Sequence, residues 1–366
     1  MNACAAENKA MRELLVDSAR RIFTDYNTRD TREAAEAGQW PSELWDAIAT
    51  AGLAAAATSG ERGGVDADAT DVAALVHTAG AMAVPVPLVE TLLAEQVLAA
   101  AGLPAVGGPA TIGPVLRGDT LRLARTLSGW RLDGVLHRIP WGRDARALAL
   151  IARHEAGWAT VRVPNRQAVA IEEGWNFARE PRDSLHFENF AVAQEDVVTA
   201  GGMDLQALLL RGALFRTLQM AGALEQVLRM TVGYANERVQ FGRPIAKFQA
   251  IQQQIAVLAT HVGASSAAAN GALEAGRGAG GGAFQVAAAK VRVGEAAGIA
   301  ASIAHQVHGA MGFTHEHALH RSTRRLWSWR DEFGGEQEWA AYVGRLAVAA
   351  GGEGLWAFLT AATEKT

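Results

Sequence analysis

The sequence has only one cysteine, Cys4, in its 366 residues. One thiol cannot form a disulfide within the chain, and a metal cluster held by several thiolates is excluded as well. This cysteine usage fits a reducing compartment. The first residues also lack a basic stretch followed by a continuous apolar segment, so we expect no signal peptide and a cytoplasmic protein.

Neither an excess of positive charge nor a long apolar run is present. Lys and Arg number 34 against 38 Asp and Glu, a net charge of −4. Nucleic-acid binding needs basic patches, so we do not expect a nucleic-acid partner. One uncharged and largely apolar run, residues 72–89, barely reaches the roughly 20 residues that span a bilayer. Because it contains Pro85 and Pro87, we interpret it as a buried helix ending in an extended turn, and we expect no membrane segment.

The composition is that of an ordinary globular protein, with 49% hydrophobic and 20% charged residues. At about 150 residues per domain, the length favours two or three packed units. Three patterns of apolar residues follow one another along the chain. Residues 1–103 show apolar positions three and four apart, which indicates helices; residues 104–203 hold short apolar runs broken by turn residues, which indicates antiparallel strands; and residues 204–366 are helical again.

This order predicts an α+β protein made of a helical N-terminal domain (1–103), a middle antiparallel β domain (104–203) and a C-terminal helical domain (204–366). The glycine-rich segment 276–282 is expected to be a flexible turn between two helices. Its glycines do not follow the spacing of a phosphate-binding loop.

Two segments of the third region carry a family signature. Residues 234–256 read YANERVQFGRPIAKFQAIQQQIA, and residues 287–325 contain QVHGAMGF within a longer helical stretch. Together they resemble the acyl-CoA dehydrogenase family, and WPSELWDAIATAGLAA near the N-terminus is similar to that family's opening domain. The resemblance covers essentially the whole chain. It implies the same fold, ending in a C-terminal four-helix bundle, and FAD as cofactor.

The resemblance also implies which residues contact FAD. Arg238 matches the arginine that reaches the FAD of a neighbouring subunit, Gln306 matches its amide partner, and Gly309 would allow the backbone to approach the pyrophosphate. Further matched contact positions are Phe241, Phe248, Gln249 and Gln337. The alternatives are a helix-end ion pair between Arg238 and Glu237, and an ordinary solvated face for Gln306.

The middle region departs from the family pattern. The family's Thr-Glu-Pro-x-x-Gly-Ser-Asp loop, which lies against the flavin, is absent, and only ATIGPV from Ala110 stands near its place. Where the family has Trp-Ile-Thr, the best register gives Arg138, Ile139 and Pro140. Proline has no N–H donor and no hydroxyl, so one flavin contact is missing. Trp141 could stack on the flavin instead or could be a core residue.

The stretch LWSWRDEFGGEQEW (326–339) contains the candidate base. Acyl-CoA dehydrogenation needs a carboxylate that removes the α-proton of the thioester. A one-residue shift relative to the family places Glu332 in that role. The alternative is that Asp331 and Glu332 are loop charges paired with Arg330 or Arg325. Residues 211–213, which match the family's other location for the base, contain no carboxylate.

Several functions therefore remain open. The first is an FAD-dependent acyl-CoA dehydrogenase of lipid metabolism that acts on an acyl-CoA thioester and passes electrons to an electron-transfer flavoprotein. The second is a non-catalytic subunit that completes the FAD site of a heterotetrameric acyl-CoA dehydrogenase. A flavin oxidase or monooxygenase on the same fold, and a plain binding chain, are further alternatives. A metal site is not expected from the four histidines His308, His315, His317 and His320. His315 and His317 are two residues apart, and no third ligand stands at helical spacing from them.

Overall fold

A computed structural model of the chain describes residues 2–127, 129–164, 169–200, 203–276 and 282–360. The chain divides into two compact units, residues 1–79 with 84–215, and residues 80–83 with 216–366. The expected division into three domains stays a prediction. Of the expected glycine-rich turn, residues 277–281 lie outside the described residues.

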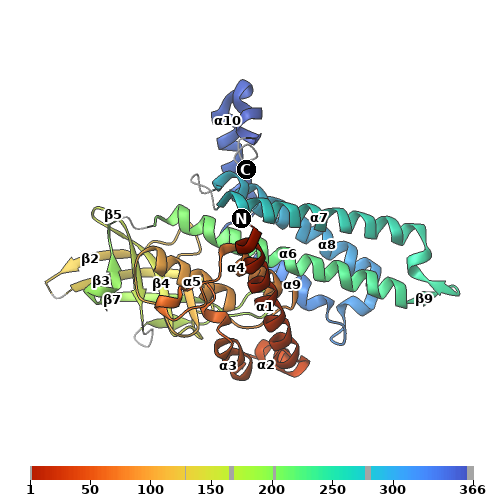
Figure 1. Cartoon of the computed structure of the whole chain (residues 1–366), viewed down its shortest axis with the longest axis horizontal. Coiled ribbons are helices and arrows are strands. Elements are labelled where there is room, and N and C mark those ends of the chain that lie inside the picture. Colours follow the sequence, from red (N-terminus) through yellow and green to blue (C-terminus); the bar gives the residue numbers. More distant parts are fainter. Residues whose placement is uncertain (1, 128, 165–168, 201–202, 277–281, 361–366) are drawn as a thin grey trace. The chain divides into compact units, whose positions relative to one another are not determined.

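The first unit begins with helices (Figure 1). Their bounds are α1 Asn2–Tyr26, α2 Arg29–Glu36, α3 Ser42–Thr50, α4 Ala69–Ala81 and α5 Leu88–Ala100. The last two residues of α4, Gly80 and Ala81, belong to the second unit. In α3 the buried residues are Leu44, Trp45 and Ile48, three and four positions apart, so one face of the helix packs inward. Buried residues occupy almost all of α5 and include two glutamates, Glu90 and Glu95.

A sheet follows in the same unit. Its strands are β1 Ala110–Gly113, β2 Arg122–Thr126, β3 Gly129–Pro140, β4 Ala147–His154, β5 Gly157–Val163, β6 Ala170–Glu172, β7 Arg182–Val192 and β8 Val197–Val198. The order is β6-β7-β3-β2-β4-β5-β8, with β1 beside β4. Most pairs are antiparallel, as expected, but β1 and β2 each pair with β4 in parallel, so the sheet is mixed. The first six residues of β4 are all buried, and α5 packs against β1 and β4.

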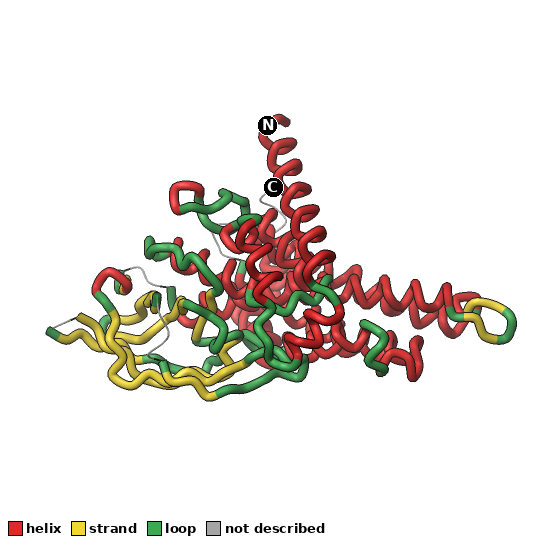
Figure 2. Tube along the Cα trace, turned by 90° about the horizontal axis from the view of Figure 1, so that it is seen from below, coloured by secondary structure: helices red, strands yellow, loops and turns green. Residues whose placement is uncertain are grey.

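Long helices make up the second unit. They are α6 Leu205–Glu237, of which the residues from Arg216 onward belong to this unit, α7 Gln249–Gly276, α8 Ala283–His308, α9 Leu319–Trp329 and α10 Glu336–Thr360. A short hairpin, β9 Val239–Gln240 with β10 Arg243–Pro244, joins α6 to α7. Figure 2 shows this hairpin in yellow at the tip of a long helix. A 3-10 turn, η6 Gly309–Phe313, continues from α8.

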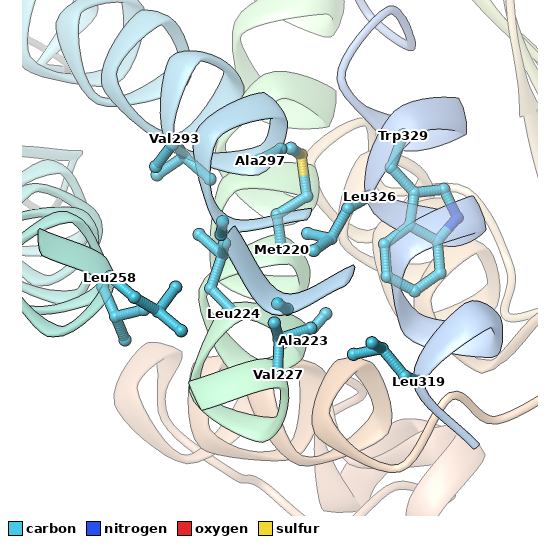
Figure 3. Packing of buried hydrophobic residues seen from close by; sticks show 14 residues of the cluster. Met220, Ala223, Leu224, Val227, Leu258, Val293, Ala297, Leu319, Leu326 and Trp329 are labelled. Atoms are coloured by element: carbon cyan, nitrogen blue, oxygen red, sulfur yellow. The ribbon is translucent and has the colours of Figure 1, made fainter. Parts of the chain in front are cut away.

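The core of this unit is shared by four helices. Met220 of α6, Leu258 of α7, Val293 of α8, and Leu326 and Trp329 of α9 belong to one buried apolar cluster, shown in Figure 3. Small residues such as alanine fill much of the α8 side, which lets the neighbouring helices approach closely. The α+β class and the order of a helical region, a sheet and a helical region are confirmed. None of the described helices is long and apolar enough to cross a membrane.

Candidate functional site

Arg238 lies directly after the end of α6. Its backbone N–H donates to the Tyr234 carbonyl at 2.8 Å, and its carbonyl accepts from Ile245 N–H at 2.8 Å, which fixes the start of the hairpin. The side chain is exposed. The alternative ion pair with Glu237 does not form among the described residues, where the Arg238 guanidinium has no partner.

The hairpin turn consists of Phe241 and Gly242, both with positive φ, at 51° and 78°. Two left-handed residues between paired strands suit a tight hairpin turn, although a phenylalanine is unusual in that conformation. Phe241 is 93% exposed. Its ring meets the edge of Phe248, with 6.1 Å between centroids, and Gln249 begins α7 with an exposed side chain. The structure therefore brings four predicted contact residues together at this tip, namely Arg238, Phe241, Phe248 and Gln249.

Gln306 and Gly309 lie at the C-terminal end of α8. Gln306 is exposed, and Gly309 ends the helix at φ 59° and ψ −142°, a conformation that side chains with a Cβ rarely adopt. A Cβ added to Gly309 would have no neighbour within 4 Å, so the backbone faces open space there. An exposed amide next to an accessible backbone can receive a ligand from outside the chain.

Rings connect the ends of α6 and α8. Tyr234 stacks on His308 with 4.5 Å between centroids and an interplanar angle of 25°. His317, from the segment before α9, meets both rings, at 6.0 Å from Tyr234 and 4.6 Å from His308. One turn earlier in α8, His305 stacks on Phe313 at 4.2 Å. These rings place the α6 and α8 contact residues at one end of the second unit.

The surroundings of the histidines in this cluster favour the neutral form of the rings. Burial lowers the pKa of His305, His308 and His317, and repulsion from neighbouring histidines lowers the pKa of His305 and His308 further. His308 Nδ1 donates to the Ala304 carbonyl at 2.7 Å. Among the described residues no group of three or more His, Cys, Asp or Glu side chains could hold a metal ion.

Gln337 lies elsewhere on the second unit, exposed at the start of α10. Its neighbour Glu336 lies where a Cβ on Gly294 would be. Gly294 is about 18 Å along α8 from Gln306, at roughly 1.5 Å per residue. Gln337 is therefore not part of the group of residues around Gln306 and Gly309 at the C-terminal end of α8.

Glu332 lies in the loop between α9 and α10 and is 7% exposed. Arg216 of α6, itself 1% exposed, donates from Nε to Glu332 Oε2 at 2.7 Å and from a second nitrogen to Gln219. The guanidinium carbon lies 5.9 Å from the Trp329 ring centroid and 5.7 Å from that of Phe333. The carboxylate is thus part of a buried ion pair between aromatic rings.

The same loop is fixed by its backbone carbonyls. The buried Lys290 ammonium donates to the carbonyls of Arg330 and Gly334, and the Trp339 indole N–H donates to the Phe333 carbonyl at 3.0 Å. Phe333 and Gly334 both have positive φ, so the chain turns sharply directly after Glu332. A loop held at three points has little freedom to move Glu332.

The alternative role for the loop carboxylates was an ion pair with Arg330 or Arg325. Arg330 instead pairs with Glu336, with Nε at 2.8 Å from Oε1, while Glu332 pairs with Arg216 and Asp331 is exposed. Three features of this unit were not predicted from the sequence, namely Arg216, Lys290 and the stack of Tyr234 on His308. The signals available were a lone lysine in an alanine-rich helix and a histidine inside the family motif.

The end of β3 differs from a flavin-binding strand. Pro140 ends the strand without an N–H donor, and its carbonyl accepts from the buried Thr111 hydroxyl at 2.5 Å. Trp141 has φ 55° and is 6% exposed, and its backbone N–H donates to Pro181. The residues in this register therefore supply neither the missing donor nor an exposed ring, so they do not fit the contact that the family makes here.

Comparison with known proteins identifies the family. The model for the acyl-CoA dehydrogenase N-terminal domain matches residues 9–107, and that for the C-terminal domain matches residues 202–351. Together these ranges cover most of the chain. The chain belongs to the acyl-CoA dehydrogenase family.

Curated relatives match over part of their length. The acyl-CoA dehydrogenase IpdE2 of Mycobacterium tuberculosis is 35% identical over 113 residues, 31% of this chain and 34% of IpdE2. The acyl-CoA dehydrogenase FadE27 of the same organism is 32% identical over 139 residues, 37% of this chain and 36% of FadE27. The chain thus aligns with about a third of the length of these two relatives.

Solved structures match over nearly the whole chain. The ChsE4-ChsE5 complex from M. tuberculosis has a TM-score of 0.83 at 25% identity, covering 92% of this chain and 96% of the matched chain. A Tcur3481-Tcur3483 steroid ACAD variant has a TM-score of 0.84 at 23% identity, covering 94% and 99%. The second likeness shows the fold alone, and it confirms the acyl-CoA dehydrogenase fold.

Proposed function

We propose that this chain is a subunit of an acyl-CoA dehydrogenase and that its C-terminal helical unit completes an FAD site carried by a second, different subunit. The observation that carries the proposal is the contrast between two sets of residues. Arg238, Gln306 and Gly309 are exposed at one end of the unit, and the Arg238 guanidinium has no partner among the described residues. Glu332, in contrast, is already committed to Arg216.

The exposed set fits the nucleotide part of FAD. A guanidinium binds pyrophosphate oxygens through paired N–H groups, and an amide can donate and accept at once. Gly309 leaves its backbone open on that side. Phe241, Val239 and Phe313 are large apolar side chains exposed at the same end, which would be covered by a neighbouring subunit.

The chain's own residues would then bind and orient the cofactor. Arg238 would hold the pyrophosphate, Gln306 would hydrogen-bond the nucleotide, and Phe241, Phe248 and Gln249 would pack at the edge of the site. When bound, FAD supplies the acceptor for the hydride that leaves the acyl chain of an acyl-CoA thioester. The carboxylate that removes the α-proton would come from the second subunit, and an electron-transfer flavoprotein would accept the electrons.

Three observations support assigning the base and the main flavin contacts to another subunit. The Arg216 guanidinium stabilises the charge of the Glu332 carboxylate and occupies one of its oxygens, so a proton would have to compete with an existing ion pair. The end of β3 lacks the donor that the family offers to the flavin, because Pro140 stands there. The similar ChsE4-ChsE5 structure is itself a complex.

A second candidate is a self-sufficient dehydrogenase in which Glu332 is the base and Gln337 is a further FAD contact. It is favoured by the nearly dry surroundings of Glu332, whose ion-pair partner lies against the rings of Trp329 and Phe333. Such surroundings suit a catalytic carboxylate. This candidate requires Arg216 to move away when the thioester binds.

Flavin content separates the two candidates. The chain would be purified alone and together with each acyl-CoA dehydrogenase chain of its source organism, and FAD per chain would be measured from the visible spectrum and by dithionite reduction. We expect a colourless chain alone and a yellow complex that an acyl-CoA bleaches. One FAD per chain in the isolated protein, with bleaching by an acyl-CoA that Glu332→Gln abolishes, would establish the second candidate instead.

A further inference from the structure

We infer that the ring stack between Tyr234 and His308 positions the two halves of the flavin-nucleotide site relative to each other, and that it holds them in place only while His308 is neutral. The inference rests on the proposed function, because the site that it describes is the one formed by Arg238, Gln306 and Gly309.

Each half of this site is connected to one ring of the stack. The Arg238 backbone N–H donates to the Tyr234 carbonyl at 2.8 Å, one helical turn earlier. His308 lies between Gln306 and Gly309 at the end of α8. The ring centroids are 4.5 Å apart and the rings are nearly parallel. The ends of α6 and α8 are therefore in direct contact through this one pair of stacked rings.

A third ring completes the arrangement. His317 meets the edge of Tyr234 at 84° and lies against His308 at 62°. Its Nδ1 accepts from Leu319 N–H at 3.1 Å, so this nitrogen carries no proton in the structure. His317 thereby connects the segment after η6 to the stack, and η6 contains Gly309.

The stack contains a group that is costly to protonate. His308 Nδ1 is satisfied by Ala304, but Nε2 is buried without a hydrogen-bond partner. The titratable groups facing His308 are Tyr234 from α6, His317 from the segment before α9, and His305 on its own helix. A proton on Nε2 would add a charge that is buried, unpaired and next to other histidines.

The direction of the pH effect follows from this environment. Burial lowers the pKa of His308 below its ordinary value of 6.5, whereas an unfolded or opened segment would titrate near 6.5. As pH falls below 6.5, the opened form gains a proton that the closed stack does not accept. The closed arrangement, and with it the flavin site, should therefore lose stability as pH falls and be fully stable above 6.5.

The test uses the oligomer that retains flavin, stripped of its cofactor, and measures its dissociation constant for FAD by flavin fluorescence at pH 7.5 and 5.5. Tyr234→Phe keeps the ring and should bind FAD like the wild type. Tyr234→Leu removes the ring and should bind roughly threefold to tenfold more weakly at both pH values. His308→Phe keeps a ring without a titratable nitrogen, so its loss of affinity between pH 7.5 and 5.5 should be smaller than that of the wild type.

A second readout does not depend on flavin. The melting temperature of the chain alone should fall between pH 7.5 and 5.5, and His308→Phe should reduce that fall. Tyr234→Leu binding FAD as tightly as Tyr234→Phe, or an unchanged pH response in His308→Phe, would overturn the inference while leaving the proposed function intact. Failure of the wild-type oligomer to bind FAD at all would overturn both.

Discussion

Arg216 and Glu332 are 116 residues apart in the sequence, yet Arg216 Nε donates to Glu332 Oε2 at 2.7 Å in the interior of the second unit. Both side chains are almost completely buried. A buried ion pair costs desolvation energy on both sides, and the fold recovers that cost only while both partners are present. The pair therefore has consequences for stability that can be measured separately from catalysis.

Replacing Glu332 with glutamine should destabilise the chain strongly. The glutamine side chain would keep the shape but leave the Arg216 charge buried without its counter-ion, which typically costs about 3–5 kcal/mol. The free energy of unfolding would be measured by urea denaturation. Asp331→Asn is the matched control, because Asp331 is the exposed neighbour in the same loop and should change stability by less than about 0.5 kcal/mol.

The double variant Arg216→Met with Glu332→Leu is a further control for this prediction. It removes both charges together, whereas Glu332→Gln removes one charge and leaves the other buried. Two apolar side chains would replace the pair without leaving an unpaired charge, so the double variant should be more stable than Glu332→Gln. A double variant that is less stable than Glu332→Gln would show that the charges are needed for other contacts in this interior.

Lys290 should make stability rise at alkaline pH. Burial lowers its pKa to about 8 from the ordinary 10.5, although the nearby carboxylates of Glu336, Glu332 and Asp331 oppose the shift. Between about pH 8 and 10.5 the unfolded chain keeps a proton that the folded chain has released, so the free energy of unfolding increases with pH in this window. Urea denaturation at pH 7.5, 8.5 and 9.5 would measure that increase.

Lys290→Met provides the control for this pH dependence, because it should remove the increase and also destabilise the loop at pH 7.5. The variant leaves the carbonyls of Arg330 and Gly334 without their donor, and an unsatisfied buried acceptor costs roughly 1–3 kcal/mol. Lys247→Met is the matched substitution of an exposed lysine, and it controls for the loss of one positive charge without the loss of a buried donor. A pH slope that is the same in Lys290→Met and the wild type would contradict the assignment of the slope to Lys290.

Much of the fold could be predicted from the sequence, because periodicity reports burial locally. Apolar residues around Trp45 recur three and four positions apart, which predicts the helix α3. The apolar residues 147–152 correspond to the buried part of β4. The parallel pairing of β1 with β4 could not be predicted. These strands are separated by the β2 and β3 hairpin, and no local pattern specifies which distant strand completes a ladder.

The candidate site likewise has a part that could be predicted from the sequence and a part that could not. Arg238, Gln306 and Gly309 could be selected because they stand in a motif, and their exposure was not predictable from it. The partner of Glu332 could not be selected, since Arg216 is in another helix and nothing in the local sequence of either residue specifies the other. The Tyr234 and His308 contact likewise depends on how α6 and α8 pack, which only the three-dimensional structure shows.

Gly80→Ala should be poorly tolerated, although alanine normally favours helices. Gly80 lies in α4, and a Cβ there would come within 1.9 Å of the backbone carbonyl oxygen of Gln219 in α6. A backbone atom cannot move aside as a side chain can, so we expect a loss of roughly 1–3 kcal/mol or more. Gly233→Ala is the control, because its Cβ would meet nothing within 4 Å, and it should stabilise α6 by about 0.5–1 kcal/mol. Equal melting temperatures for the two variants would contradict the close approach.

Arg238→Gln tests the proposed flavin contact directly. A hydrogen bond to a charged group contributes about 1.5–3 kcal/mol, so removing the guanidinium should weaken FAD binding by the oligomer roughly tenfold or more. Arg229→Gln is the matched control, since Arg229 is an exposed arginine in α6, the helix that Arg238 directly follows, and its side chain donates to Gln226. Because Arg238 has no partner within the described part of the chain, its substitution should leave the melting temperature of the isolated chain unchanged. A stable Arg238→Gln variant that releases FAD would therefore place the effect in the contact between this chain and the cofactor, whereas retention of FAD equal to that of Arg229→Gln would remove Arg238 from the site.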